Sequence, residues 1–370
     1  MPHDTRADPA RQYARLRYRI RLMDMALNLA VLAAFQWSGA SLAVARWWSA
    51  RFVNQPLVIL GYLAVFGACS YAVTLPLHFY STFLLEHRFG LSRMTPTDWL
   101  VRELKQLAVG AVLGAAIVEG FYAMLRHAPR QWPLLATLAW VALTVVLARA
   151  FPTVLLPMFY KTTPVRDDAL VQRLVELCRR VGVEALGVFR FELGKETRKA
   201  NAALAGLGKT RRVLLSDTLM AEFSPEEIEG VLAHELAHHH YRHIVKMLCL
   251  SAAGSWIALT LTDLAGRWWV PVLGLRGLSD IAGCPAVMLW LSLLGCAAMP
   301  FHNGLSRYFE WQSDRFAVRM TIARPAFASA LRRLAALNLA DPHPPRWVVW
   351  LWYDHPPIAQ RIEAAERAAA

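Results

Sequence analysis

Apolar residues gather along this chain in six stretches, each long enough to cross a lipid bilayer, which takes about 20 of them. The predicted spans are 22–48, 56–84, 104–126, 132–158, 244–266 and 281–305. The first is the weakest, because Gln36, Trp37 and Ser38 interrupt it. The pattern predicts a polytopic α-helical membrane protein.

The segments between the spans have the patterns of a mixed soluble domain. Residues 167–182 place apolar side chains at helical spacing, residues 183–194 alternate as a β-strand does, and residues 211–220 predict a second strand. We expect this division of the chain: a basic tail, 1–21; a membrane domain of four spans, 22–158; the first part of a soluble domain, 159–243; two further spans, 244–305; and its second part, 306–370.

Positive charge decides the orientation of these spans. The chain has 40 Lys and Arg against 27 Asp and Glu, a net charge of +13, and six arginines precede residue 22. Because positive residues collect on the cytoplasmic side, we expect the N-terminus there, and counting crossings brings 159–243 and 306–370 to the same side. Basic loops account for the charge and no nucleic-acid-reading motif is found, so we expect no nucleic-acid partner. The five cysteines form no CxxC pair and are expected to be packing residues.

A well-capped helix is predicted just before the fifth span. Ser224 can cap it, Pro225 fits its first turn, and Glu227 completes a capping box. The helix ends in the histidine-rich sequence HELAHHHYRH, which runs from residue 234 to 243.

Two of these histidines share one helical face. His234 and His238 are four residues apart, and Glu235 lies beside that face. This is His-Glu-x-x-His, which offers two imidazoles to a zinc ion and a carboxylate to activate water. His239 and His240 are turned away on a continuous helix, and His243 falls on roughly the opposite face, so we expect none of the three to bind the metal.

A catalytic zinc needs a third protein ligand and an open position for water. The segment SRYFEWQSDRFAVRM supplies two carboxylates that share a helical face, Glu310 and Asp314. We predict that Glu310 is the third ligand. Asp314, one turn further on, could accept a hydrogen bond from a ligand histidine and so fix its tautomer.

Several motifs in order and at matching spacing resemble one family, the M48 membrane zinc metalloproteases, and within it the integral-membrane CAAX prenyl proteases. The similar segments after about residue 56 are STFLLEHRFGLSRMTPTDWLVRELK, LLPMFYKTTPV, KANAALAGLGKTRRVLLSDTLM, HELAHHHYRH, SRYFEWQSDRFA and WYDHPPIAQRI. The resemblance implies about six spans enclosing a chamber, with a cytoplasmic zincin-like α+β metalloprotease domain. It also implies one Zn²⁺ per chain, with the zinc near the cytoplasmic face.

The resemblance also implies a role for each matching residue. His234, His238 and Glu310 would bind zinc, with Glu235 as general base and Asp314 supporting the site or donating a proton. His355 would stabilise the oxyanion with Arg361 nearby. Asn201 and Ala202 would lie on the edge strand that pairs with an extended peptide substrate.

Two departures from the family bear on the substrate. The eukaryotic members have an additional N-terminal span, and their NAYFYG pattern is NAALAG here. The Ala- and Arg-rich composition suggests a bacterial inner membrane, where prenylated proteins are not expected, so lipopeptide or membrane-protein processing stays open. We expect a peptide or protein substrate, with or without a lipid group, and contact with membrane lipid.

Three alternatives remain at this point. A quality-control protease of the heat-shock HtpX type would have fewer spans, and a six-span transporter with a metal-binding domain would need an internal repeat, which is not seen. A catalytically silent scaffold conflicts with the intact zinc motif. Within the spans, Glu119 could line a chamber or pair with Arg149, and the pairing is the favoured interpretation.

Overall fold

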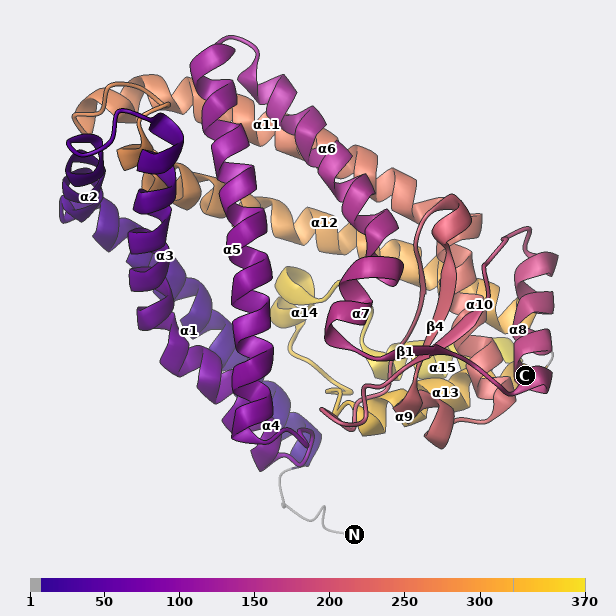
Figure 1. Cartoon of the computed structure of the whole chain (residues 1–370). Coiled ribbons are helices and arrows are strands. Elements are labelled where there is room, and N and C mark those ends of the chain that lie inside the picture. The colour runs from indigo at the N-terminus through magenta and orange to yellow at the C-terminus, as the bar shows by residue number, and fades with distance from the viewer. Residues whose placement is uncertain (1–7, 322, 370) are drawn as a thin grey trace.

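The computed structural model describes residues 8–321 and 323–369, and it confirms a membrane domain joined to a small α+β domain (Figure 1). Six helical segments are long and apolar enough to cross a membrane, as predicted: Pro9–Trp37, Gln55–Arg88, Pro96–His127, Trp132–Phe159, His243–Val272 and Ile281–Met320.

The first half of the chain is almost entirely helical. Its elements are α1 (Pro9–Trp37), α2 (Ala40–Ser49), α3 (Gln55–Phe79), a π-helical turn (Tyr80–Leu84), α4 (Leu85–Arg88), α5 (Pro96–His127), α6 (Trp132–Ala150), a second π-helical turn (Phe151–Leu155) and α7 (Leu156–Phe159). Wide turns of this kind relieve a helix at a proline, and Pro152 lies within the second of them.

The predicted first span, 22–48, and the predicted basic tail, 1–21, are corrected by the structure. Helix α1 begins at Pro9, so the arginine-rich segment is helical, and it ends at Trp37. Gly39 then adopts a left-handed conformation with φ of 81°, which a helix cannot continue through, and the ten-residue α2 starts afresh. Helix α2 is too short to cross a bilayer.

A four-stranded sheet forms the soluble domain with the helices around it. The elements are β1 (Thr162–Pro164), α8 (Asp168–Arg180), β2 (Val188–Phe191), β3 (Ala202–Ala205), a 3₁₀ turn (Gly208–Thr210), β4 (Arg212–Ser216), α9 (Asp217–Glu222) and α10 (Pro225–His240). The strand order is β1-β2-β4-β3, with β3 antiparallel to β4 at the edge. The helix and both strands predicted here are confirmed.

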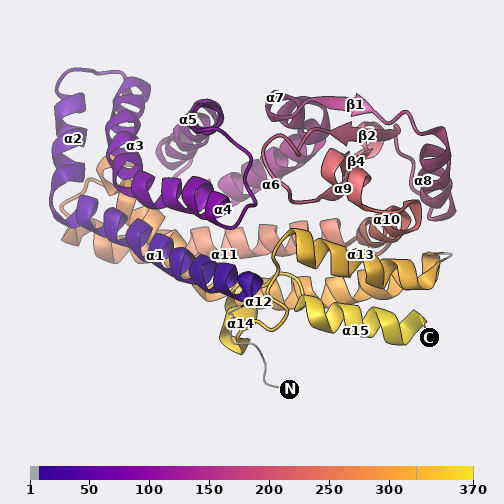
Figure 2. The same cartoon turned by 90° about the horizontal axis from the view of Figure 1, so that it is seen from below.

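The last third of the chain returns to the membrane twice. It contains α11 (His243–Val272), a 3₁₀ turn (Ile281–Gly283), α12 (Cys284–Met320), α13 (Arg324–Leu337), α14 (Arg346–Trp352) and α15 (Ile358–Ala369). Helix α12 continues well beyond the predicted end of the sixth span, so one unbroken helix runs from the membrane domain into the soluble domain. Figure 2 shows α12 passing beside α13 and α15.

The core of the soluble domain holds α10 in place. Leu232 and Leu236, almost fully buried, belong to a cluster with Leu174 and Leu177 of α8 and Phe327 of α13. Helix α10 is therefore covered on several sides, and its histidine-bearing face is the part that turns toward α12.

The predicted pairing of Glu119 with Arg149 is wrong. Among the described residues no ion pair joins them, and Glu119 Oε1 is buried without a hydrogen-bond partner. Helices α5 and α6 form a hairpin around residues 128–131. Glu119 lies about ten residues before this turn and Arg149 about twenty after it, so the two differ in depth by about 14 Å.

The packing of α2 against α3 depends on Gly61, because a Cβ atom there would overlap the indole ring of Trp48. A Cβ atom at Gly67, two turns on in α3, meets nothing within 4 Å. We expect Gly61→Ala to lower the thermal midpoint in detergent, since Trp48 must move. Gly67→Ala should leave it unchanged or raise it, because alanine favours a helix by about 1 kcal/mol over glycine. Equal midpoints for the two variants would contradict this packing.

Candidate metal centre

The start of α10 is fixed by the predicted capping box. The Ser224 hydroxyl accepts from the backbone N–H of Glu227, and the Glu227 carboxylate accepts from the backbone N–H of Ser224. Glu227 is also held by Arg333 of α13 at 3.0 Å. The helix therefore presents its His-Glu-x-x-His turn in one orientation.

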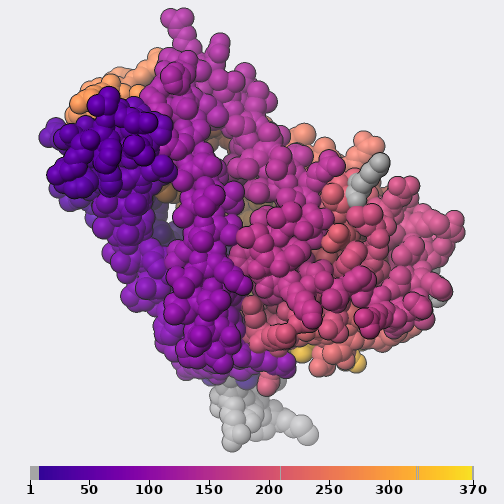
Figure 3. Space-filling model, viewed as in Figure 1, coloured from indigo at the N-terminus to yellow at the C-terminus, as the bar shows by residue number. Residues whose placement is uncertain are grey.

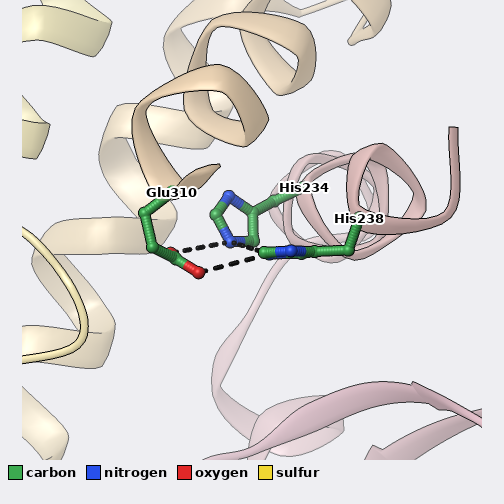
Figure 4. A group of neighbouring side chains, drawn as sticks. All are labelled: His234, His238 and Glu310. Atoms are coloured by element: carbon green, nitrogen blue, oxygen red, sulfur yellow. Dashed lines mark hydrogen bonds and ion pairs between the residues drawn. The ribbon is translucent and has the colours of Figure 1, made fainter. Parts of the chain in front are cut away.

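Three side chains from two helices point at one another (Figure 4). His234 Nε2 lies 3.2 Å from Glu310 Oε2, His238 Nε2 lies 3.2 Å from Glu310 Oε1, and the two Nε2 atoms are 3.4 Å apart. Ligand atoms about 2.0–2.1 Å from a tetrahedral zinc lie about 3.3–3.4 Å from one another. The spacing and the donor set, two imidazoles and a carboxylate, both fit such an ion.

Behind this group, Asp314 and Arg361 form a buried ion pair. Asp314 Oδ1 lies 2.9 Å from His234 Nδ1, which leaves Nε2 as the atom that faces His238 and Glu310. Arg361 donates from Nε and Nη2 to the two Asp314 oxygens at 2.8 and 2.7 Å. A bidentate pair of this kind fixes the carboxylate in a plane and therefore orients the histidine.

The electrostatics of the site favour a positive charge between the histidines. Burial opposes protonation of His234, but Asp314 and Glu310 outweigh it and raise its pKa to about 9. Burial likewise opposes the charge on Arg361, and Asp314 outweighs it and raises its pKa. Among the described residues, Glu310 Oε2 has no hydrogen-bond partner although it is buried. These are the properties expected where a cation binds.

His355 reaches the same group from the segment between α14 and α15. Its Nε2 lies 3.4 Å from Glu310 Oε2, and its Nδ1 lies 2.9 Å from Asp354 Oδ1. The His355 hydrogen bond lowers the pKa of Asp354, so this carboxylate stays ionised and orients the ring. About half of the His355 side chain is exposed, which leaves its Nε2 open toward a substrate.

The segment before His355 is held by two side chains of α12. Asn303 of α12 donates to the backbone oxygen of Leu351, and Arg307 donates to those of Val349 and Tyr353. Arg307 lies in the segment SRYFEWQSDRFA that resembles the family, and Asn303 lies before it. Contacts to backbone oxygens leave no signal in the side-chain pattern, so neither contact could be predicted.

His239, His240 and His243 are not among the three side chains that converge here, and the predicted position of His243 on the opposite face is wrong. Arg242 has a left-handed φ of 55°, so α10 ends at His240, with Tyr241 as its C-cap, and α11 begins at His243. His243 Nδ1 therefore reaches His238 Nδ1 at 3.2 Å, and its Nε2 meets Gln312 Oε1 at 2.9 Å. It braces a ligand histidine instead of facing away from it.

The remaining predicted residues lie on α10 and at the start of β3. Glu235 follows His234 on α10 and is partly buried. Asn201 immediately precedes β3, where its backbone N–H donates to Ser216 Oγ at 2.9 Å. Ala202 opens β3 and pairs with Leu215 of β4, which leaves the other edge of β3 unpaired in the sheet.

Comparison with known proteins decides the family. A family model described as "CAAX prenyl protease N-terminal, five membrane helices" matches residues 3–161. The model of peptidase family M48 matches residues 164–369, more than half of the chain. The chain belongs to peptidase family M48.

Relatives of this M48 chain extend over most of its length. It is 25% identical to YhfN, named as a metalloprotease, of Bacillus subtilis (strain 168), over 98% of this chain and 88% of the relative. It is 28% identical to CAAX prenyl protease 1 of Saccharomyces cerevisiae, over 85% of this chain and 72% of the relative. The crystal structure of S. mikatae Ste24p matches with a TM-score of 0.86 at 24% identity, over 96% of this chain and 88% of that one, which shows the same fold.

The M48 chain is thus an integral-membrane metalloendopeptidase that resembles the CAAX prenyl proteases. Membership implies a metal and a peptide or protein substrate. The transporter alternative is set aside by the same matches.

The geometry predicts which residues hold the metal. Glu310→Ala should lose most of the bound metal after dialysis, because only two of three converging ligands remain. His240→Ala is the matched control: His240 is exposed and packs against Phe316, so its removal should leave the metal content unchanged. Elemental analysis of both purified variants makes the measurement. Full metal content in Glu310→Ala would exclude Glu310 as a ligand.

Proposed function

We propose that this M48 chain is a zinc endopeptidase of a bacterial inner membrane, with one Zn²⁺ per chain and its active site at the cytoplasmic side. The observation that carries the proposal is the triangle of His234, His238 and Glu310 at tetrahedral spacing. Helix α10, which bears the two histidines, packs against the edge strand β3. The orientation rests on the arginines of α1.

The residues around the ion have separable roles. When bound, zinc acts as a Lewis acid that polarises the scissile carbonyl and lowers the pKa of a water at the site. The Glu235 carboxylate accepts a proton from the attacking water and delivers it to the leaving amine. As an imidazolium, with Nδ1 donating to Asp354, His355 donates a hydrogen bond from Nε2 to the oxyanion. Asp314 with Arg361 keeps His234 in the tautomer that presents Nε2.

The substrate is proposed to be an extended polypeptide that carries a lipid group or an apolar segment. An extended strand can pair with the free edge of β3 at Asn201 and Ala202. An apolar cavity of about 490 Å³ lies between α5, α6 and α11 and is lined mainly by Ala, Leu, Phe and Trp side chains. In the space-filling view the membrane domain is hollowed beside α5 (Figure 3). Such a cavity suits an isoprenoid or acyl chain.

The six candidate spans favour this function over a quality-control protease of the HtpX type, for which fewer spans are expected.

Glu235 provides the sharpest test of the chemistry. We expect Glu235→Gln to keep its metal and to reduce peptide cleavage by about 10²- to 10⁴-fold, the contribution of a positioned base. Metal content and cleavage of a fluorogenic peptide would be measured on the same preparation. A variant that cuts at near the wild-type rate would show that another group takes the proton.

The substrate class is tested by three peptides of one sequence: a farnesylated CAAX peptide, the same peptide with an acyl chain on the cysteine, and the unmodified peptide. We expect both lipidated forms to have a lower KM than the unmodified form, because the lipid occupies the apolar cavity. Equal KM values for all three would contradict a lipidated substrate and favour membrane-protein processing.

A further inference from the structure

Helix α14, with the sequence RWVVWLW, exposes large aromatic side chains, which are uncommon on a helix that faces water. Its buried face carries Val348 and Trp352, which are one turn apart. Its other face carries Trp347 and Trp350, which are 50% and 60% exposed. Two tryptophans on the outer face of so short a helix indicate an apolar or interfacial partner, because contiguous exposed aromatic surface is uncommon on a water-facing protein.

The position of α14 relative to the spans identifies that partner. It packs on α12 through Asn303 and Arg307, which bond its backbone oxygens at 2.7 and 2.8 Å. The twenty residues of α12 from Cys284 onward cover about 30 Å, the thickness of the hydrocarbon layer. Helix α14 therefore contacts α12 at the level where this span leaves the apolar layer.

The surface around α14 continues the membrane-facing surface of the protein. Phe301, two residues before Asn303 on α12, is 80% exposed. Figure 2 shows α14 projecting outward beyond α1 and α12, away from the space between α12 and α5. The exposed tryptophans thus belong to the outside of the molecule, next to lipid, and not to the interior of the membrane domain.

We propose that α14 lies in the headgroup region of the bilayer that surrounds the spans, with Trp347 and Trp350 at the boundary between headgroups and acyl chains. Tryptophan is enriched at this depth because its ring is apolar and its N–H can still bond to water or to ester oxygens. Arg346, exposed at the start of the helix, can meet a lipid phosphate.

The proposed position of α14 also affects the position of His355, and this part of the proposal rests on the proposed function. Helix α14 ends at Trp352, and His355 follows three residues later. Arg307 bonds the backbone oxygens of both Val349 and Tyr353, so helix and segment move together. A bilayer that fixes the depth of α14 thereby fixes the approach of His355 Nε2 to Glu310. Trp347 and Trp350 are positioning residues that act through this segment.

The lipid contact can be tested without any activity measurement. Full-length protein in phosphatidylcholine vesicles would be compared with Trp347→Phe/Trp350→Phe, with Trp352→Phe, which removes a buried ring of the same helix, as control. Lipids would be brominated either near the glycerol or near the chain end. The emission of Trp347 and Trp350 is the difference between the wild type and the double variant, and we expect bromine near the glycerol to quench it. The emission of Trp352 is the difference between the wild type and the control, and we expect neither lipid to quench it.

Emission from Trp347 and Trp350 that neither lipid quenches would overturn the proposal. Quenching mainly by chain-end bromine would place α14 too deep and would also overturn it. A doubling of molecular mass that depends on these two tryptophans would assign the surface to a second copy of the chain instead.

The positioning role has its own readout. Trp347→Ser/Trp350→Ser should keep its metal and lower kcat in vesicles with KM unchanged, and the Phe double variant should restore kcat. If the quenching is as expected but the Ser variant keeps its kcat, the lipid contact of α14 stands and only its link to His355 is overturned. Failure of the zinc mechanism would appear separately, as retained cleavage in Glu235→Gln.

Discussion

The rest of the site depends on two buried carboxylates one turn apart on α12, Glu310 and Asp314. Buried charges must be paired, because an unpaired ion loses its hydration at a cost of several kcal/mol. Arg361 supplies one positive charge through a bidentate pair with Asp314. A divalent cation at Glu310 would supply the remainder and would leave Glu235 balanced as well. The same two carboxylates raise the pKa of His234 to about 9, because they favour a positive charge on its ring.

A single helix, α12, connects these two carboxylates to the membrane domain. Because α12 is continuous from Cys284 to Met320, the depth of its apolar half in the bilayer sets the position of Glu310. Helix α10 reaches the same place from the soluble domain, and its capping box and buried leucines leave it little freedom. The chemistry proposed at the membrane surface therefore depends on one helix shared by both parts, and the His355 segment meets that helix at Glu310.

Helical periodicity was enough to predict the spans, the capped α10 and the shared faces of His234 with His238 and of Glu310 with Asp314. These features depend on neighbours within one or two turns. The errors arose where a single backbone conformation intervened, since neither the left-handed Gly39 nor the left-handed Arg242 changes the hydropathy pattern. The predicted pairing of Glu119 with Arg149 was wrong because the two residues lie at different distances from the turn between α5 and α6. The span boundaries alone could have shown this difference in depth. The backbone contacts of Asn303 and Arg307, and the arrival of His355 at Glu310, are long-range and needed the folded chain; the resemblance to a family had suggested only that His355 belongs to the site.

X-ray absorption at the zinc edge on the purified, reconstituted protein tests the central claim most directly. The account predicts a shell of nitrogen and oxygen at about 2.0–2.1 Å, with outer scattering from two imidazoles and no sulfur at about 2.3 Å. It also predicts that the shell is unchanged when His239 or His240 is replaced by Ala. A sulfur contribution, a third imidazole, or a shell that loses scattering in one of these variants would contradict the assignment of His234, His238 and Glu310 as the ligands.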